Sequence, residues 1–135
     1  MTLVDTNVLL DLLTAHPVWT EWSKLALGQA AASGAVFIND VVHAELSVRF
    51  SAVELVDEFV RGSGLERLPI PPASLFLAGK AFARYRASGG TRTGVLPDFS
   101  IGAQAAVLGI PLLTRDPNRY RTYFPHIVLI TPPTA

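Results

Sequence analysis

Thr2-Leu3-Val4-Asp5-Thr6-Asn7 is the stretch around which the rest of this chain is organised. Leu3 and Val4 are apolar, the next three residues are polar, and the apolar residues that follow recur at the spacing of a helix. This order predicts a short buried strand, a tight polar turn and a helix. Asp5 would then end the strand, and open parallel sheets collect their ligands at the carboxyl ends of strands.

The same order of short apolar run and helical segment recurs along the chain. Strands are expected at 35–38, 65–68, 110–114 and 127–130, and helices at 8–13, 17–32, 39–49, 51–62, 72–87 and 97–109. Asn39 and Ser51 are predicted to cap the helices that follow them. Alternating strands and helices require crossover connections, so we expect a mostly parallel sheet of about five strands with helices on both faces. The predicted fold is a three-layer α/β/α arrangement, with residues 1–135 forming a single domain.

Composition excludes several classes of protein. Half of the residues are hydrophobic and 16% are charged, which excludes a disordered chain. The formal net charge is zero, which argues against binding nucleic acid through bulk positive charge but leaves room for a local basic rim. The chain contains no cysteine, so disulfides and thiolate metal sites are excluded. Because we find neither a signal-peptide pattern nor an apolar run of membrane-spanning length, we expect a cytoplasmic protein with no membrane partner.

Acidic residues stand at several expected junctions between strands and helices: Asp5, Glu45, Asp98 and Asp116. Each has an ordinary explanation when taken alone. Asp5 can cap a helix, and Glu45 can pair with Arg49 four residues further on. Asp98 can complement a helix dipole, and Asp116 can begin a turn.

Taken together, these acids predict a metal site, because the carboxyl ends of parallel strands share one edge of a sheet. Carboxylates within about 5 Å of one another would repel by roughly 3 kcal/mol per pair at an effective dielectric of 20. A divalent cation would neutralise such a cluster. Oxygen ligands, with neither cysteine nor an obvious histidine pair, favour Mg²⁺ or Mn²⁺ over zinc.

The blocks that carry the acids together resemble those of the PIN-domain nucleases. They are Leu3-Val4-Asp5-Thr6-Asn7, Glu45 on its helix, Asp98-Phe99-Ser100-Ile101-Gly102-Ala103 and Leu112-Leu113-Thr114-Arg115-Asp116. The length and the closing run Tyr120-Arg121-Thr122-Tyr123-Phe124-Pro125 are most similar to the VapC toxins of VapBC toxin–antitoxin pairs. Gly102 departs from the pattern, because these proteins often have alanine there. The segment 51–93 carries no motif of the family.

The resemblance implies a PIN-like fold and a metal-dependent endoribonuclease. Asp5, Glu45, Asp98 and Asp116 would hold Mg²⁺, for which Mn²⁺ would substitute, and a metal-activated water would attack an RNA phosphodiester. The RNA would be of the tRNA or rRNA class. The implied partners are a VapB-type antitoxin and a second copy of the chain.

Residues beside the acids are candidates for supporting roles. Asn7 and Thr114 would orient a carboxylate or a water. Arginines precede Asp98 and surround Asp116, which predicts a basic rim around an acidic pocket; these are Arg84, Arg86, Arg92, Arg115, Arg119 and Arg121. Arg115 is the best candidate among them for gripping a substrate phosphate.

Two other interpretations remain open from the sequence. One is a catalytically inactive PIN-fold domain that binds RNA or acts as a scaffold. The other is a phosphoacceptor or phosphatase domain, which fits poorly because a phosphatase of the haloacid-dehalogenase type needs a second aspartate where Asn7 stands. Divalent-metal binding separates the nuclease from the inactive domain.

Overall fold

The computed structural model describes residues 1–133. Its elements run in the order β1 (Thr2–Val4), α1 (Thr6–Leu13), α2 (Thr20–Ser33), β2 (Val36–Asn39), α3 (Asp40–Ser47), α4 (Val53–Gly62), β3 (Leu65–Leu68), α5 (Pro72–Ala87), α6 (Leu96–Leu108), β4 (Leu112–Leu113), α7 (Asn118–Tyr123) and β5 (Leu129–Ile130). In this described part of the chain, no helix combines the length and apolar character required to cross a bilayer.

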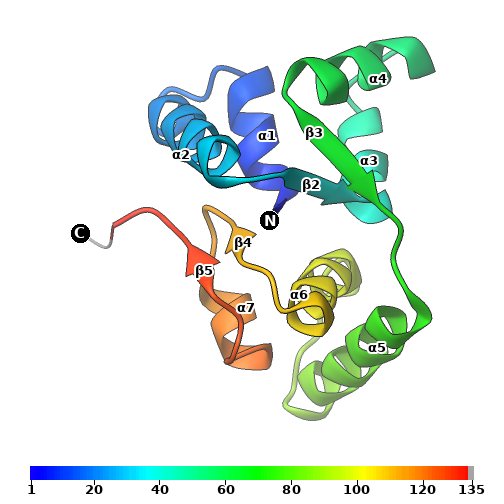
Figure 1. Ribbon diagram of the computed structural model, residues 1–135. Coiled ribbons are helices and arrows are strands. Elements are labelled where there is room, and N and C mark those ends of the chain that lie inside the picture. The colour runs from blue at the N-terminus through cyan, green and yellow to red at the C-terminus, as the bar shows by residue number, and fades with distance from the viewer. Residues whose placement is uncertain (134–135) are drawn as a thin grey trace.

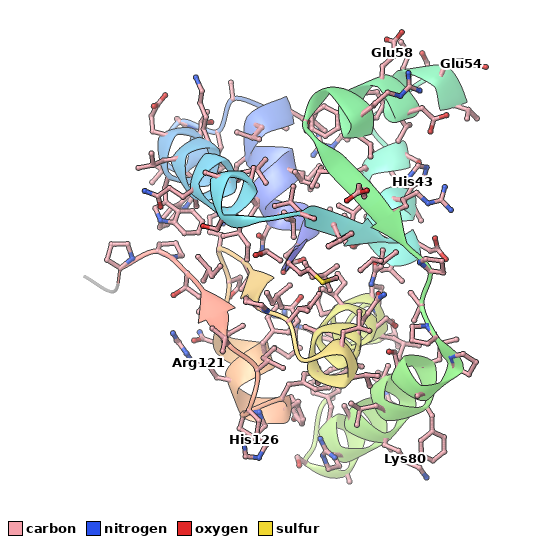
Figure 2. The ribbon with its side chains drawn as sticks, in the orientation of Figure 1. His43, Glu54, Glu58, Lys80, Arg121 and His126 are labelled. Carbon is pink, nitrogen blue, oxygen red and sulfur yellow. The ribbon has the colours of Figure 1, made fainter. Side chains whose placement is uncertain are left out.

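All strand pairs of the sheet are parallel, and the strand order is β3-β2-β1-β4-β5. Figure 1 shows α1 to α4 on one side of this sheet and α5 to α7 on the other. The structure therefore confirms the predicted three-layer α/β/α fold with a parallel sheet of five strands. Charged side chains such as Glu58, Lys80 and Arg121 project outward from the layers (Figure 2).

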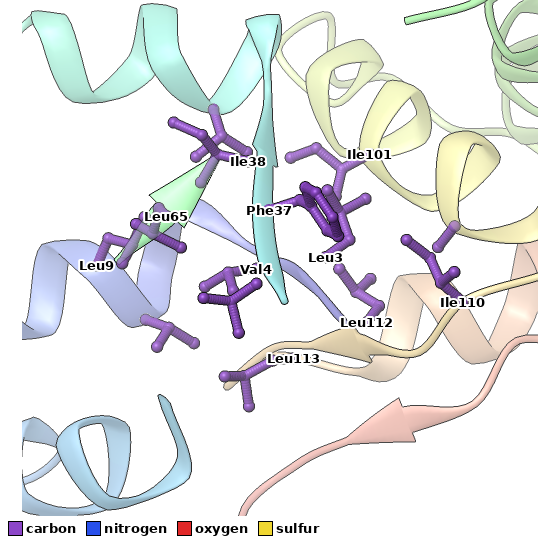
Figure 3. Close-up of a cluster of buried hydrophobic side chains, with 14 of the residues drawn as sticks. Leu3, Val4, Leu9, Phe37, Ile38, Leu65, Ile101, Ile110, Leu112 and Leu113 are labelled. Atoms are coloured by element: carbon purple, nitrogen blue, oxygen red, sulfur yellow. The ribbon is translucent and has the colours of Figure 1, made fainter. Parts of the chain in front are cut away.

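The core forms where the two helical layers meet the central strands. Leu3 aligns with Phe37 and with Leu112, and these three buried side chains lie together on the face covered by α6. Val4 and its neighbour Leu113 point to the opposite face, toward α1 (Figure 3). Successive residues of a strand point to opposite faces, so a strand buried on both faces is apolar throughout. This packing holds the carboxyl ends of β1 and β4 side by side.

Several predicted boundaries need correction. The second helix begins at Thr20 rather than Pro17, because the Nδ1 atom of His16 accepts hydrogen bonds from the backbone N–H groups of Val18 and Trp19 in the preceding turn. Asn39 caps α3 as predicted, with its side chain accepting from the Val42 N–H at 3.0 Å.

The prediction that Ser51 caps the next helix is wrong. Ala52 holds the cap position of α4 and makes no side-chain cap bond. The sequence analysis also missed α7, which is only six residues long. A helix this short gives too few turns for its apolar spacing to be recognised.

Candidate active site

One pocket at the carboxyl edge of the sheet collects all of the predicted acidic residues. It has a volume of about 430 Å³ and is lined by Asp5, Thr6, Asn7, Leu10, Glu45, Asp98, Asp116, Asn118, Arg119 and Tyr120. Asp5 comes from the end of β1 and Asp116 follows β4, whereas Glu45 lies on α3 and Asp98 in the first turn of α6. The fold thus places carboxylates from both helical layers around one space.

Asp5 is the most buried and most heavily hydrogen-bonded of these acids. The residue is 4% exposed. Its Oδ1 accepts from the Thr6 N–H at 2.8 Å, and its Oδ2 accepts from the hydroxyls of Thr114 at 2.9 Å and Tyr120 at 2.8 Å. Burial nevertheless outweighs these hydrogen bonds and, with the charge of Asp98, raises the pKa of Asp5 to about 6. Asp5 is therefore fixed in place while its negative charge remains poorly compensated.

Asn7 and Thr114 link the first turn of α1 to the loop after β4. The Asn7 amide donates to the Thr114 hydroxyl at 3.3 Å and to Asp5 Oδ2 at 3.4 Å, and its Oδ1 accepts from the Arg115 N–H at 3.1 Å. The Asp116 N–H donates to the Thr114 hydroxyl at 3.1 Å. These bonds fix the loop after β4 against the start of α1, and with it the spacing of Asp5 and Asp116.

Glu45 faces Thr6 rather than Arg49. The Thr6 hydroxyl donates to Glu45 Oε1 at 2.7 Å. Partial burial raises the pKa of Glu45, and the negative charge of Asp98 raises it further. The ordinary explanation of Glu45 as half of a surface ion pair with Arg49 therefore does not describe the structure.

Asp98 shares the pocket with a cation from the protein itself. The guanidinium of Arg119, on α7, donates from Nη1 to Asp98 Oδ2. Burial still raises the pKa of Asp98, with Arg119 opposing the rise and the charge of Asp116 adding to it. Asp116 itself is exposed. The sequence analysis grouped Arg119 with other rim arginines and did not identify this pairing.

Arg115 is placed beside the pocket rather than in it. Its Nε and Nη2 donate to the two carboxylate oxygens of Asp11 at 2.8 and 3.0 Å, and its guanidinium lies 5.6 Å from the ring centre of Trp19. Asp11 is 1% exposed and also accepts from the Ser23 hydroxyl at 2.7 Å. Arg115 therefore anchors the loop that carries Asp116, and its guanidinium is bonded to Asp11.

Tyr120 is a pocket residue that the sequence analysis did not single out. It is 2% exposed, and burial together with the neighbouring charge of Asp5 raises the pKa of its hydroxyl well above the usual value, so it stays protonated as a donor. The close packing of Tyr120 against α6 depends on Gly102, where an added Cβ would lie 2.6 Å from the Phe124 ring and 3.0 Å from the Tyr120 ring. The glycine at position 102 is the sequence feature that permits this close packing.

The donor set of the pocket suits a hard divalent cation, because it consists of carboxylate, amide and hydroxyl oxygens. Burial is the main cause of the raised pKa values of Asp5, Glu45 and Asp98, so their charged forms are poorly solvated in the pocket. As placed, however, no group of three or more acidic or histidine side chains within residues 1–133 surrounds a single point closely enough to hold a metal ion.

The five-stranded parallel sheet and the acidic pocket at its carboxyl edge place this protein among the α/β proteins that carry a site at the ends of their strands. The sequence model of the PIN-domain family matches residues 2–125, so this chain belongs to that family.

Solved structures share the fold. A chain from VapBC2 of Rickettsia felis, crystallised bound to a DNA fragment from their promoter, aligns with a TM-score of 0.72 and 18% identity over 96% of this chain and 97% of that chain. A chain from DNA-bound VapBC of Salmonella typhimurium gives 0.69 and 19% over 96% of both chains. A chain from FitAcB of Neisseria gonorrhoeae gives 0.61 and 18%, again over 96% of both. A search of curated protein sequences gave no significant match.

Proposed function

We propose that this protein is a divalent-cation-dependent endoribonuclease and the VapC-type toxin of a type II toxin–antitoxin pair. The observation that carries the proposal is the meeting of Asp5, Glu45, Asp98 and Asp116 in one pocket of a PIN domain. These acids would hold Mg²⁺, with Mn²⁺ able to substitute. The bound ion would lower the pKa of a water and neutralise charge that develops on the phosphate oxygens.

The protein's own contribution begins with the position of Asp5. Thr114 and Tyr120 hold one of its carboxylate oxygens, while Oδ1 has a single donor and retains capacity for another partner. A carboxylate fixed in this way loses little freedom on binding, which favours a defined geometry for hydrolysis.

Glu45 and Asp98 bring two more of these carboxylates to the pocket, from α3 and α6. Burial raises the pKa of both, and a bound cation would stabilise their charged forms. Thr6 orients Glu45 through its hydroxyl. Asn118 and Arg119 line the same pocket and supply donors for a phosphate.

The proposed partners follow from the fold relatives. The structures of similar fold come from VapBC and FitAB assemblies, and another is a toxin–antitoxin complex from Klebsiella pneumoniae. We therefore propose a VapB-type antitoxin as the partner, a homodimer as the assembly and the cytoplasm as the location. The RNA substrate would be of the tRNA or rRNA class.

The test is cleavage of total cellular RNA by purified, antitoxin-free protein, with Mg²⁺, with Mn²⁺ and with chelator, and with cut ends mapped by sequencing. Asp98→Asn removes a pocket charge, whereas Asp57→Asn makes the same change at an exposed position on α4 and serves as the control. Both variants are first shown to fold by circular dichroism.

Discrete cuts that require the cation, persist in Asp57→Asn and vanish in Asp98→Asn are the expected result. Absence of cleavage together with absence of cation binding would reject the nuclease. It would leave the alternative, a PIN-fold domain that binds RNA or acts as a scaffold without catalysis.

A further inference from the structure

Two arginines near the pocket are held in very different ways. Arg115 makes a two-pronged contact with Asp11, whose side chain is 1% exposed. Arg119 makes a single contact with Asp98, and the two side chains are 26% and 35% exposed. Solvent reaches both arginines to a similar extent, since the Arg115 side chain is 27% exposed, but Arg115 makes two bonds to a buried carboxylate whereas Arg119 makes one bond to a carboxylate that solvent also reaches. A single ion pair with both partners partly exposed is weak and opens readily. The Arg119–Asp98 contact is thus the one that can be exchanged.

The charge of Asp98 affects several other acids of the pocket. Its negative charge acts on Asp5 and on Glu45, and the charge of Asp116 acts on Asp98 in turn. A cation shared among these acids would have to approach Asp98, where the guanidinium of Arg119 already stands. Two positive charges at one carboxylate repel each other, so the guanidinium and a divalent cation compete for it.

The backbone of α7 keeps Arg119 beside the pocket even when its side chain leaves Asp98. The next residue, Tyr120, is buried and bonded to Asp5, and its ring lies close to Gly102 of α6. A displaced guanidinium therefore stays at the mouth of the pocket. Guanidinium groups bind phosphate oxygens through paired N–H donors.

We propose that Arg119 is an internal counter-ion that competes with the divalent cation for Asp98 and, once displaced, contacts the phosphate of the substrate. This inference rests on the proposed function. It assigns to Arg119 the phosphate contact that the sequence analysis expected from Arg115.

The experiment compares Mn²⁺ binding by isothermal titration calorimetry in the parent protein, Arg119→Gln, Arg121→Gln and Asp98→Asn. Arg121 is the matched control, because it lies on α7, is exposed and projects away from the body of the protein (Figure 2). Loss of a partly exposed competing ion pair should tighten Mn²⁺ binding about threefold to fivefold in Arg119→Gln. Arg121→Gln should bind like the parent, and Asp98→Asn should bind more weakly.

A second readout tests the phosphate contact. With Mn²⁺ at saturation, Arg119→Gln should lower kcat/KM for RNA cleavage by about tenfold or more, and Arg119→Lys should restore part of the loss. Unchanged or weaker Mn²⁺ binding in Arg119→Gln would overturn the counter-ion role. Full cleavage by that variant at saturation would overturn the phosphate contact.

These outcomes are distinct from failure of the proposed function. If the parent binds Mn²⁺ and Asp98→Asn does not, the cation site stands whatever Arg119→Gln does. If Arg119→Gln binds Mn²⁺ and the parent does not, the competition is supported in its strongest form. If neither protein binds Mn²⁺, the cation site and the role of Arg119 are rejected together.

Discussion

The two sides of the pocket are built on different principles. The fixed side is formed by buried or half-buried residues that bond to one another: Asp5, Asn7, Thr114 and Tyr120. The open side is formed by side chains with fewer contacts and more exposure: Glu45, Asp98, Asp116 and Arg119. The fixed side sets one carboxylate in place, and the open side leaves the remaining charges free to rearrange.

This difference follows from the cost of burying polar groups. Inside the protein, an unpaired polar group is expensive, so Asp5 is supplied with several donors. Near solvent the cost is lower, and Asp98 can exchange one partner for another. A site that must admit both a cation and a polyanion benefits from having one side of each kind.

The largest expected effect on stability comes from removing the support behind the fixed side. Arg115→Gln leaves the buried carboxylate of Asp11 without its ionic partner, which should lower the free energy of unfolding by about 3 kcal/mol. Urea unfolding at neutral pH measures the change. Arg121→Gln, the exposed control on α7, should stay within about 0.5 kcal/mol of the parent. Equal stability of Arg115→Gln and the parent would show that the fixed side needs no such anchor.

The pH dependence of stability tests the uncompensated charge of Asp5. Its pKa is raised from 3.8 to about 6, so the folded state holds a proton that the unfolded state releases. In the presence of chelator, the free energy of unfolding should therefore fall as pH rises from about 4 to about 6, by up to about 3 kcal/mol for this group.

Asp5→Asn removes this titration, so its unfolding free energy should fall less over the same pH interval. Glu45 and Asp98 have raised pKa values too and remain in both proteins, so the difference between the two curves isolates Asp5. Parallel curves for the parent and Asp5→Asn would contradict the raised pKa.

A smaller effect is expected from the tyrosine of the fixed side. Tyr120→Phe removes one donor from the ionised Asp5 and should lower the free energy of unfolding by about 2 kcal/mol at pH 7. The loss should shrink at pH 4.5, where Asp5 is mostly protonated. Tyr123→Phe is the control, because Tyr123 lies on the same helix and its ring packs against Phe99 and Tyr85 rather than bonding to Asp5. Equal losses in the two variants would mean that the Tyr120 hydroxyl does not support Asp5.

The smallest expected effect concerns the packing that brings Tyr120 to the pocket. Gly102→Ala places a methyl group against the rings of Phe124 and Tyr120, which should cost about 1 kcal/mol of stability. If α7 shifts to accommodate the methyl group, RNA cleavage should fall as well. Thermal unfolding and cleavage measured on the same preparation separate the two effects. Gly79→Ala on α5, where an added Cβ meets no atom within 4 Å, is the control.

The fold and the meeting of the acids were predictable because both follow from strand direction. Leu3-Val4 and Leu112-Leu113 are apolar on both faces, which requires covering helices, and parallel strands bring Asp5 and Asp116 to one edge. The ion pairs were not predictable. The pairing of Arg115 with Asp11 and of Arg119 with Asp98 depends on how elements distant in sequence pack. Two arginines close together in the sequence give no local signal of their partners.

The contact of Tyr120 with Asp5 escaped the sequence analysis for a related reason. It spans 115 positions in the chain and depends on α7, a helix too short to show apolar periodicity. The departure at Gly102 marked the place where α7 packs closely, yet only the structure shows which rings occupy that space.

The most direct test of the central claim is the position of Mn²⁺ in a crystal of the full chain, located by its anomalous scattering. The account predicts a manganese peak in the pocket, in contact with Asp5 and Asp98, with the Arg119 guanidinium turned away from Asp98. A pocket that stays free of manganese at saturating Mn²⁺, with Arg119 still bonded to Asp98, would contradict it. That result would leave a PIN domain whose acids are balanced by the protein itself.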